Sequence, residues 1–233
     1  MKLLRTSGNY LKNQARIRLF LALYCGVTLT VLLLSAVQPL PFYVPLGDYG
    51  VVRTLIMVSS VVMFWYWWRR YNSYKYGFAG ETHVTQLLKS ALPDDYYLLN
   101  NVIPTQGHGN IDHVILSPRG IFVIETKNWG GKIVCHADQW SRKRGNPSKQ
   151  ARINALRIKN IIQSMEQFSS AKLWVEAIVV FSNYNAKLNI NKPTVEVKKP
   201  YELPNYLLNF KGKNNFSTQE LELIGNEILR QSK

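Results

Sequence analysis

The sequence predicts a mixed α/β domain that follows two membrane-spanning helices. Two apolar runs without a charged residue lie in the N-terminal third, at 19–38 and 54–68. Beyond them, helical and extended patterns follow one another in the order helix, strand, strand, strand, helix, strand. Two of these strands, which flank Ser117-Pro118-Arg119-Gly120 within the stretch 109–127, are rich in Ile and Val and yet carry charged side chains. We expect this pair of strands to organise the domain.

The first apolar run has the length that a helix needs to cross a bilayer, about 20 residues. The run at 54–68 is shorter, but residues 49–52 can extend it, and Arg53 can reach toward the headgroups. It closes in an aromatic cluster followed by two arginines, as at a membrane interface. A cleaved signal peptide is the alternative for the first run, but the length of the run and the second span argue against it.

Basic residues flank the two spans on their outer sides. The loop between the spans is nearly uncharged, with one aspartate and three prolines. Positive charge favours the cytoplasmic side, so we expect a multi-pass protein of the cell (inner) membrane with both termini in the cytoplasm. Residues 1–18 then form a basic cytoplasmic N-terminus, and residues 19–70 form a two-helix anchor in the lipid bilayer. The flanking residues are Lys2, Arg5, Lys12, Arg16 and Arg18 before the first span and Arg69, Arg70 and Lys75 after the second.

The formal net charge of +15 does not come only from the membrane flanks. From residue 76 onward, 20 Lys and Arg residues face 13 Asp and Glu residues. A basic domain behind an anchor suits a polyanionic partner, either nucleic acid or the anionic inner leaflet. The two cysteines, Cys25 and Cys135, offer no disulfide framework and fit a reducing compartment.

The α/β domain is expected to begin after a short linker at 71–78. Its first helix starts at Ala79 and stops at Pro93, and a later helix starts at Asn146-Pro147, where Asn caps and Pro takes the first helical position. Pro118 and Gly120 supply the turn between the two charged strands. The other expected elements are a strand at 96–103, a polar loop at 104–109, a short strand at 132–135, the end of the later helix near 168, a strand at 173–181, an edge strand at 194–197, and helices at 201–210 and 217–231.

The charged residues of the paired strands are the candidate site. Asp112 lies on the first strand, and Glu125 and Lys127 lie on the second. Side chains alternate along a strand, so Glu125 and Lys127 share a face, and pairing can bring Asp112 onto it. Two carboxylates and a lysine can hold a hard divalent cation and place an ammonium beside a developing negative charge, which is the chemistry of phosphodiester cleavage. A structural salt bridge of Lys127 with either carboxylate is the alternative.

The order of elements resembles the restriction-endonuclease-like αβββαβ core of the PD-(D/E)XK nuclease superfamily. The motifs resemble those of its nuclease-related domain family, NERD, over about residues 78–182, which we take as the domain core. Residues 183–233 form a C-terminal extension, an edge strand and helices, that the resemblance does not explain. The matching pieces are Gly80-Glu81, Ile111-Asp112-His113-Val114, the run from Gly120 to Asn128, and Asn146-Pro147-Ser148-Lys149-Gln150.

The resemblance implies roles for individual residues. Asp112 and Glu125 would hold Mg²⁺ or Mn²⁺ together with the carbonyl of Thr126, and Lys127 would orient water or stabilise the transition state. Glu81 would complete the site, or it is a favourable charge at a helix N-terminus. Gln150 would hold a metal-bound water or a phosphate, or it is a surface amide.

A basic segment runs from residue 142 to 159 without an acidic residue. Such a segment can neutralise phosphates without reading sequence, although a solvated helix face is the alternative. We therefore expect one of two functions. The first is a membrane-anchored, metal-dependent nuclease (a phosphodiester hydrolase) that acts on DNA, with RNA as the other substrate, at the cytoplasmic face. The second is a catalytically weak or inactive nuclease-fold module that binds nucleic acid or a protein partner. The residues expected to bind nucleic acid are Arg142, Lys143, Arg144, Lys149 and Arg152.

Overall fold

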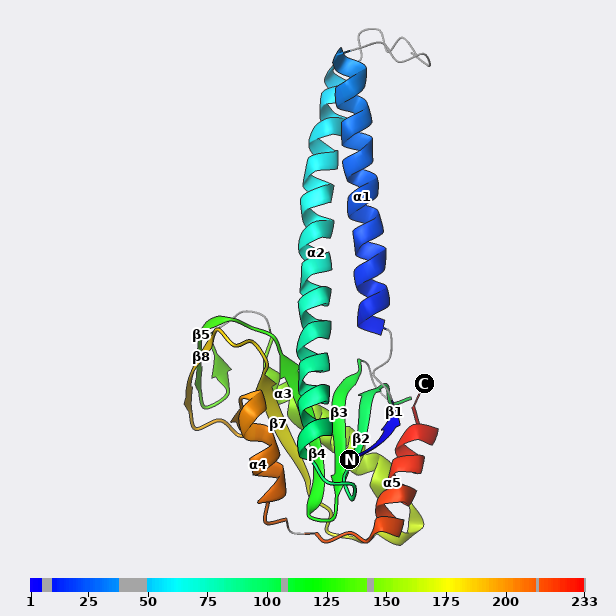
Figure 1. The fold of residues 1–233 in the computed structure, drawn as a ribbon, viewed down its shortest axis with the longest axis vertical. Coiled ribbons are helices and arrows are strands. Elements are labelled where there is room, and N and C mark those ends of the chain that lie inside the picture. The colour runs from blue at the N-terminus through cyan, green and yellow to red at the C-terminus, as the bar shows by residue number, and fades with distance from the viewer. Residues whose placement is uncertain (6–9, 38–49, 106–108, 142–144, 213, 233) are drawn as a thin grey trace. The chain divides into compact units, whose positions relative to one another are not determined.

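The computed structural model describes residues 1–5, 10–37, 50–105, 109–141, 145–212 and 214–232 (Figure 1). The chain divides into two compact units. The first unit combines Met1–Gly8 with Ala79–Lys233, and the second is Asn9–Phe78. The α/β domain therefore includes residues from both ends of the sequence, and the second unit is inserted between them.

The second unit contains α1 (Tyr10–Val37) and the larger part of α2 (Gly50–Ala91). Both helices are long and apolar enough to cross a membrane. Only 6% of the most apolar stretch of each helix is buried within the structure. The expected spans lie within these helices, except for residue 38, which lies outside the described residues with the loop up to residue 49. Arg53 donates from Nη2 to the carbonyl oxygen of Leu32 at 3.0 Å. Its charge is thus placed against the backbone of α1.

The linker expected at 71–78 is wrong, because α2 continues through it without a break. Pairs four residues apart support the helix there. Arg70 lies over the ring of Tyr66 just before this segment, and Lys75 lies over the ring of Tyr71 within it, at 5.6 and 5.7 Å from the ring centroids. Composition alone suggested a linker because it does not record these pairs.

The first unit is built on a six-stranded sheet in the order β1-β2-β3-β4-β7-β9 (Figure 1). The strands β2, β3 and β4 are antiparallel, whereas β1 runs parallel to β2, β7 parallel to β4, and β9 parallel to β7. The order helix, strand, strand, strand, helix, strand is confirmed. The strands are β1 (Lys2–Arg5), β2 (Tyr97–Val102), β3 (Ile111–Ser117), β4 (Gly120–Lys127), β7 (Val175–Phe181) and β9 (Glu196–Lys198).

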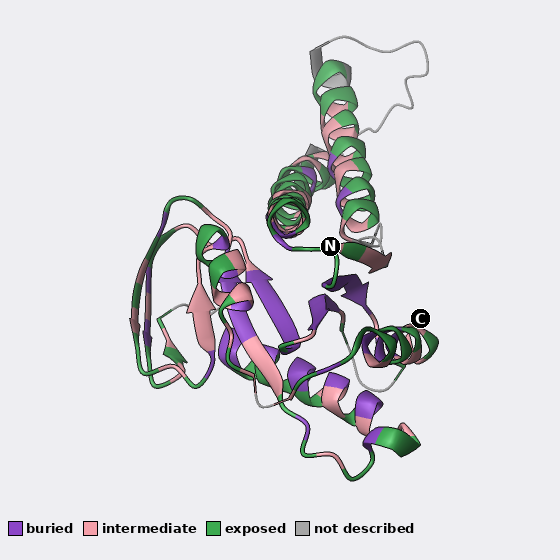
Figure 2. Cartoon of the chain, turned by 60° about the horizontal axis from the view of Figure 1, so that its bottom comes forward, coloured by how far each residue is buried: buried purple, intermediate pink, exposed green. Residues whose placement is uncertain are grey.

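The central hairpin of β3 and β4 closes through a short turn that is held by hydrogen bonds of the Ser117 side chain. Ser117 pairs with Gly120, and the register continues to His113 opposite Ile124. The Ser117 hydroxyl donates to the Gly120 carbonyl and accepts from the Arg119 amide, at 3.0 and 3.2 Å. Gly120 has a φ of +155°, at the edge of the region that glycine favours. Nearly every residue of both strands is buried (Figure 2), so one fixed register places the charged residues.

Helices cover both faces of the sheet. On one face, α3 (Pro147–Gln163) packs on β4 and β7, and α5 (Thr218–Arg230) packs on β2 and β3, over buried apolar residues of these strands. On the other face lie α4 (Leu203–Leu208) and the last turns of α2, which contribute Val84 and Leu88. Asn146 caps α3 by accepting the Lys149 amide at 2.9 Å, as expected. This arrangement is the expected α/β class with a central sheet.

Several elements differ from the expectation. The helix expected to reach residue 168 ends at Gln163, and the 3-10 turn η1 (Glu166–Phe168) follows it. A similar turn, η2 (Pro200–Glu202), precedes α4. The expected strand at 132–135 is present as β5 (Gly131–His136) in a second sheet of order β6-β5-β8. The strands β1, β6 (Gln139–Trp140) and β8 (Ala186–Asn191) were not expected. The strand β6 has only two residues and pairs with its neighbour β5, whereas β1 and β8 are short strands that pair with distant segments.

Candidate active site

Three carboxylates from three elements form one electrostatic cluster. Asp112 on β3 is 6% exposed and Glu125 on β4 is 2% exposed. Burial raises the pKa of Asp112 to about 6, and burial with the charge of Asp112 raises the pKa of Glu125 to about 8. Glu81, beyond the apolar stretch of α2, has its pKa raised to about 9 by burial and by the charges of Asp112 and Glu125. The structure thus brings together all three acids that the sequence selected.

Lys127 lies against this cluster. Its Nζ donates to Glu125 Oε1 at 2.6 Å and to Gln150 Oε1 at 3.0 Å. Gln150 comes from the first turn of α3, so this helix is joined to the end of β4 by the lysine. The ion pair required by the structural alternative is present, but it engages one of the three carboxylates only.

Asn154 is a member of the site that the sequence analysis missed. It is 4% exposed, and its Nδ2 donates to Glu125 Oε2 at 3.3 Å. Asn154 lies one turn beyond Gln150, so both amides face the end of β4. That spacing of four on a helix is the signal that could have identified it. Asn154 and Lys127 together occupy both oxygens of Glu125.

A buried chain of polar side chains supports the backbone between the charged residues. His113 Nδ1 lies 2.7 Å from Asn100 Oδ1, and His113 Nε2 lies 3.2 Å from Thr126 Oγ1. Burial lowers the pKa of His113 to about 3, so the ring is neutral. The amide of Thr126 donates to Asp112 Oδ2 at 2.7 Å. The position of Asp112 is therefore fixed from the strand that carries Glu125 and Lys127.

Gly80 lets helix α2 approach the ends of β4 and β7. A Cβ atom at this position would collide with the hydroxyl of Ser182 and lie 3.1 Å from Cβ of Asn128. Glu81 follows directly, and it reaches the cluster because of this close approach. The alternative of a favourable charge at a helix N-terminus is wrong, because α2 begins at Gly50 and Glu81 lies deep within it.

The comparison with protein families agrees with this geometry. Residues 76–182 match the model of the nuclease-related domain, NERD. These residues form a nuclease-related domain. The resemblance in the sequence is thereby confirmed, and the match includes Glu81, Asp112, Glu125, Lys127 and Gln150.

Two further similarities of this chain add little information. An uncharacterized protein of Bacillus anthracis is 36% identical over 85 residues, which are 35% of this chain and 37% of that protein. The matched part is thus well under half the length of that relative. The solved structure of Pyrococcus furiosus SfsA in complex with Ca²⁺ covers 67% of this chain and 53% of its own, at 15% identity and a TM-score of 0.23.

The donor set of the nuclease-related domain suits a hard cation. Among the described residues, no group of three or more His, Cys, Asp or Glu side chains is arranged to hold a metal ion. The set implied by the resemblance is smaller, since it combines Asp112 and Glu125 with the carbonyl oxygen of Thr126. All three donors are oxygen atoms, and the two carboxylates are buried at a cost that a divalent charge would offset. The residues present therefore fit Mg²⁺ or Mn²⁺.

The expected nucleic-acid contacts are described only in part. Arg142, Lys143 and Arg144 lie outside the described residues. Lys149 is exposed and makes no ion pair within the described part of the chain. Arg152 donates to Asp138 Oδ2 at 3.2 Å and to Thr194 Oγ1 at 2.6 Å, so Asp138 offsets its charge.

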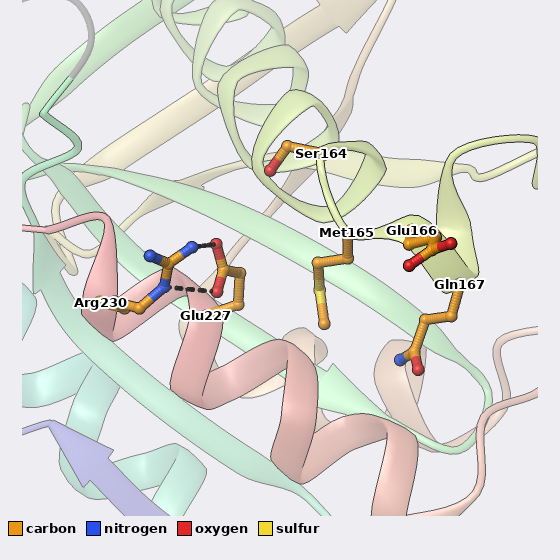
Figure 3. Close-up of a pocket in the computed structure, with 6 residues that line it drawn as sticks. All are labelled: Ser164, Met165, Glu166, Gln167, Glu227 and Arg230. Atoms are coloured by element: carbon orange, nitrogen blue, oxygen red, sulfur yellow. Dashed lines mark hydrogen bonds and ion pairs between the residues drawn. The ribbon is translucent and has the colours of Figure 1, made fainter.

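A cavity of about 550 Å³ lies away from the carboxylate cluster, between the end of α3 and α5 (Figure 3). Its acid and base are already paired, because Arg230 Nη2 lies 2.7 Å from Glu227 Oε1. The arginine lowers the pKa of Glu227. This cavity offers no buried, uncompensated carboxylate, so size alone does not make it the candidate site. Its lining is Ser164, Met165, Glu166, Gln167, Glu227 and Arg230.

Proposed function

We propose that this chain is a membrane-anchored, metal-dependent nuclease that hydrolyses phosphodiester bonds of DNA, with RNA as the second substrate to test. The observation that carries the proposal is the cluster of Glu81, Asp112 and Glu125 beside Lys127. All three acids have raised pKa values, so the cluster is under-compensated in the absence of a cation. A fold that needed only stability has little physical reason to gather them.

Asp112, Glu125 and the Thr126 carbonyl would hold the divalent cation. When bound, the cation supplies positive charge beside the scissile phosphate and lowers the pKa of a coordinated water. His113 supports this arrangement indirectly, because its bond to the Thr126 hydroxyl steadies the residue that also donates to Asp112.

The side chains around the cation site have separate roles in hydrolysis. Lys127 carries a donor that can face the charge developing on the phosphate, and Gln150 accepts from it at 3.0 Å and so limits its orientation. Glu81, whose pKa is raised to about 9, can hold a proton or, once ionised, accept one from the attacking water.

We further propose that α1 and α2 cross the inner membrane and that both termini face the cytoplasm. Support comes from β1, which pairs with β2 in the same sheet. Residues 2–5 and 97–102 must then lie on one side of a membrane, so the chain between them crosses an even number of times. The basic flanks favour the cytoplasm for that side. At ~1.5 Å per residue, the 42 residues of α2 exceed the ~30 Å hydrocarbon core, so the helix extends beyond it.

A binding module without turnover is the second candidate. Both oxygens of Glu125 are engaged within the protein, by Lys127 at 2.6 Å and by Asn154 at 3.3 Å. A structural ion pair would have this arrangement. The nucleic-acid partner would then be held by basic residues such as Lys149, and the carboxylates would only stabilise the fold.

Cleavage assays on the purified full chain in detergent separate the two candidates. Labelled single- and double-stranded DNA and RNA are incubated with Mg²⁺, with Mn²⁺ and with a chelator. We expect cleavage only with a divalent cation. Binding without cleavage under all of these conditions would favour the module. Reporter fusions after residue 233 test the topology, and a fusion that is active only outside the cytoplasm would contradict it.

A further inference from the structure

A cleft of about 360 Å³ lies along the first turns of α3, beside the carboxylate cluster. Two residues belong both to the cleft and to the candidate site, because Gln150 accepts from Lys127 and Asn154 donates to Glu125. A molecule in the cleft would therefore lie next to the reacting groups. The lining is Gly109, Asn110, Asn146, Lys149, Gln150, Ile153 and Asn154.

The cleft combines an apolar surface with polar groups that are not engaged. Ile153 is 48% exposed, although isoleucine is among the residues most often buried. Asn110 donates from Nδ2 to Asn101 Oδ1 at 2.7 Å, which leaves its own side-chain oxygen as an acceptor. Within the described residues, Nε2 of Gln150 makes no hydrogen bond and Nζ of Lys149 makes no ion pair. The cleft thus offers an apolar face, an acceptor, a donor and a cation.

These properties match one nucleotide. A nucleobase has an apolar face and a polar edge, and side-chain amides can pair with that edge. A phosphate completes the match, since lysine binds it as a point charge. The volume of about 360 Å³ is near the lower end of the ~300–1,000 Å³ typical of small-molecule sites. It suits one base and not a base pair.

We infer that this cleft binds one unpaired nucleotide next to the scissile phosphate. The base lies on Ile153, its edge faces Asn110 and Gln150, and a neighbouring phosphate lies near Lys149. A base within a duplex would first have to leave its stack and its partner, whereas a base in a single strand is already accessible. The inference rests on the proposed function, and it narrows the substrate to single-stranded or locally unpaired nucleic acid.

Binding of labelled DNA to the full chain in detergent, in a chelator and at fixed salt, tests the inference without cleavage. A short single strand should bind more tightly than the matching blunt duplex. Ile153→Ala should raise the Kd for the single strand about tenfold, through lost apolar contact, and leave the duplex Kd unchanged. Leu156→Ala is the matched control, because Leu156 is 56% exposed on the same helix but outside the cleft. It should change neither Kd.

Two results would overturn the inference. One is that Ile153→Ala changes the Kd for the single strand and the Kd for the duplex equally, and the other is that the parent protein binds the duplex as tightly as the single strand. Ile153→Thr provides a second variant that keeps the branched shape should the alanine variant fold poorly. Cleavage in Mg²⁺ by the same preparations tests the proposed function separately. Strand preference without cleavage would refute the nuclease and keep the cleft. Equal cleavage of both forms, unaffected by Ile153→Ala, would refute the cleft and keep the nuclease.

Discussion

The α/β domain, which includes both the nuclease-related residues 76–182 and α5, contains acidic residues in two opposite electrostatic settings. On the surface of α5, Glu227 accepts two hydrogen bonds from Arg230, which lower the pKa of Glu227 and raise that of Arg230. At the end of the central hairpin, three acids share one lysine, and burial raises the pKa of each. The surface pair is balanced by itself, whereas the buried cluster requires a further positive charge. Changes at the cluster should therefore have large effects on function, and changes at the pair should have small ones.

The largest effect is expected for Asp112→Asn, which removes a carboxylate from the cluster but keeps its shape. Metal-dependent cleavage should be abolished. In the parent, Mg²⁺ or Mn²⁺ should raise the melting temperature, because the ion binds the folded cluster and offsets carboxylate repulsion, and the variant should lose this rise. Nucleic-acid binding in a chelator should persist, since it depends on basic residues elsewhere. A parent protein whose melting ignores both cations would contradict the metal site.

Lys127→Ala should have the next largest effect and a different pattern. Cleavage should fall by about a hundredfold or more through loss of a preorganised charge, while stabilisation by divalent cations survives. The structural ion pair predicts the reverse. Glu125, 2% exposed, would lose its partner, and the free energy of unfolding would fall by ~3–5 kcal/mol with no metal response in the parent. Denaturant unfolding with and without Mg²⁺ decides between the two patterns.

A change of pH in the absence of metal is expected to have a smaller effect, which acts on the stability of the folded state. The pKa values of Asp112, Glu125 and Glu81 rise on folding from ordinary values of 3.8, 4.5 and 4.5 to about 6, 8 and 9. The folded state therefore binds protons more tightly than the unfolded state. The contribution of these three groups to the free energy of unfolding is fully present below pH 4, and it is lost as the pH rises through 6 to 9.

Thermal melting in a chelator at pH 5 and pH 9 measures this loss. Stabilisation by Mg²⁺ should grow over the same range, because the cation binds the ionised carboxylates. Glu81→Gln is the control, and it should weaken the pH dependence of the metal-free protein. A melting temperature that rises between pH 5 and pH 9 through these groups would contradict the raised pKa values.

The smallest effect is expected for Arg230→Ala, which breaks the balanced pair. Arg230 is 73% exposed at its side chain, and exposed pairs contribute little. The free energy of unfolding should change by less than about 1 kcal/mol, and the rate of cleavage should stay the same. A marked loss of cleavage in this variant would mean that the cavity of Figure 3 takes part in function.

The parts of the domain that the sequence predicted well depend on near neighbours. Two apolar runs rich in Ile and Val and the Pro118–Gly120 turn predicted β3 and β4, and Asn146-Pro147 predicted the start of α3. The elements that were missed depend on distant partners. The strand β1 is only four residues long and exists through its pairing with β2, which lies more than ninety residues later in the chain. No local pattern records such a pairing.

The sequence by itself determined that Glu125 and Lys127 share a face, because side chains alternate along a strand, and it allowed Asp112 to join them across one tight turn. Only the tertiary structure decided the rest of the site. Gln150 and Asn154 reach Lys127 and Glu125 because α3 packs on the sheet, and Glu81 reaches the acids because Gly80 lets α2 approach Ser182. Packing of this kind depends on the shapes of surfaces far apart in the chain, which local spacing does not encode.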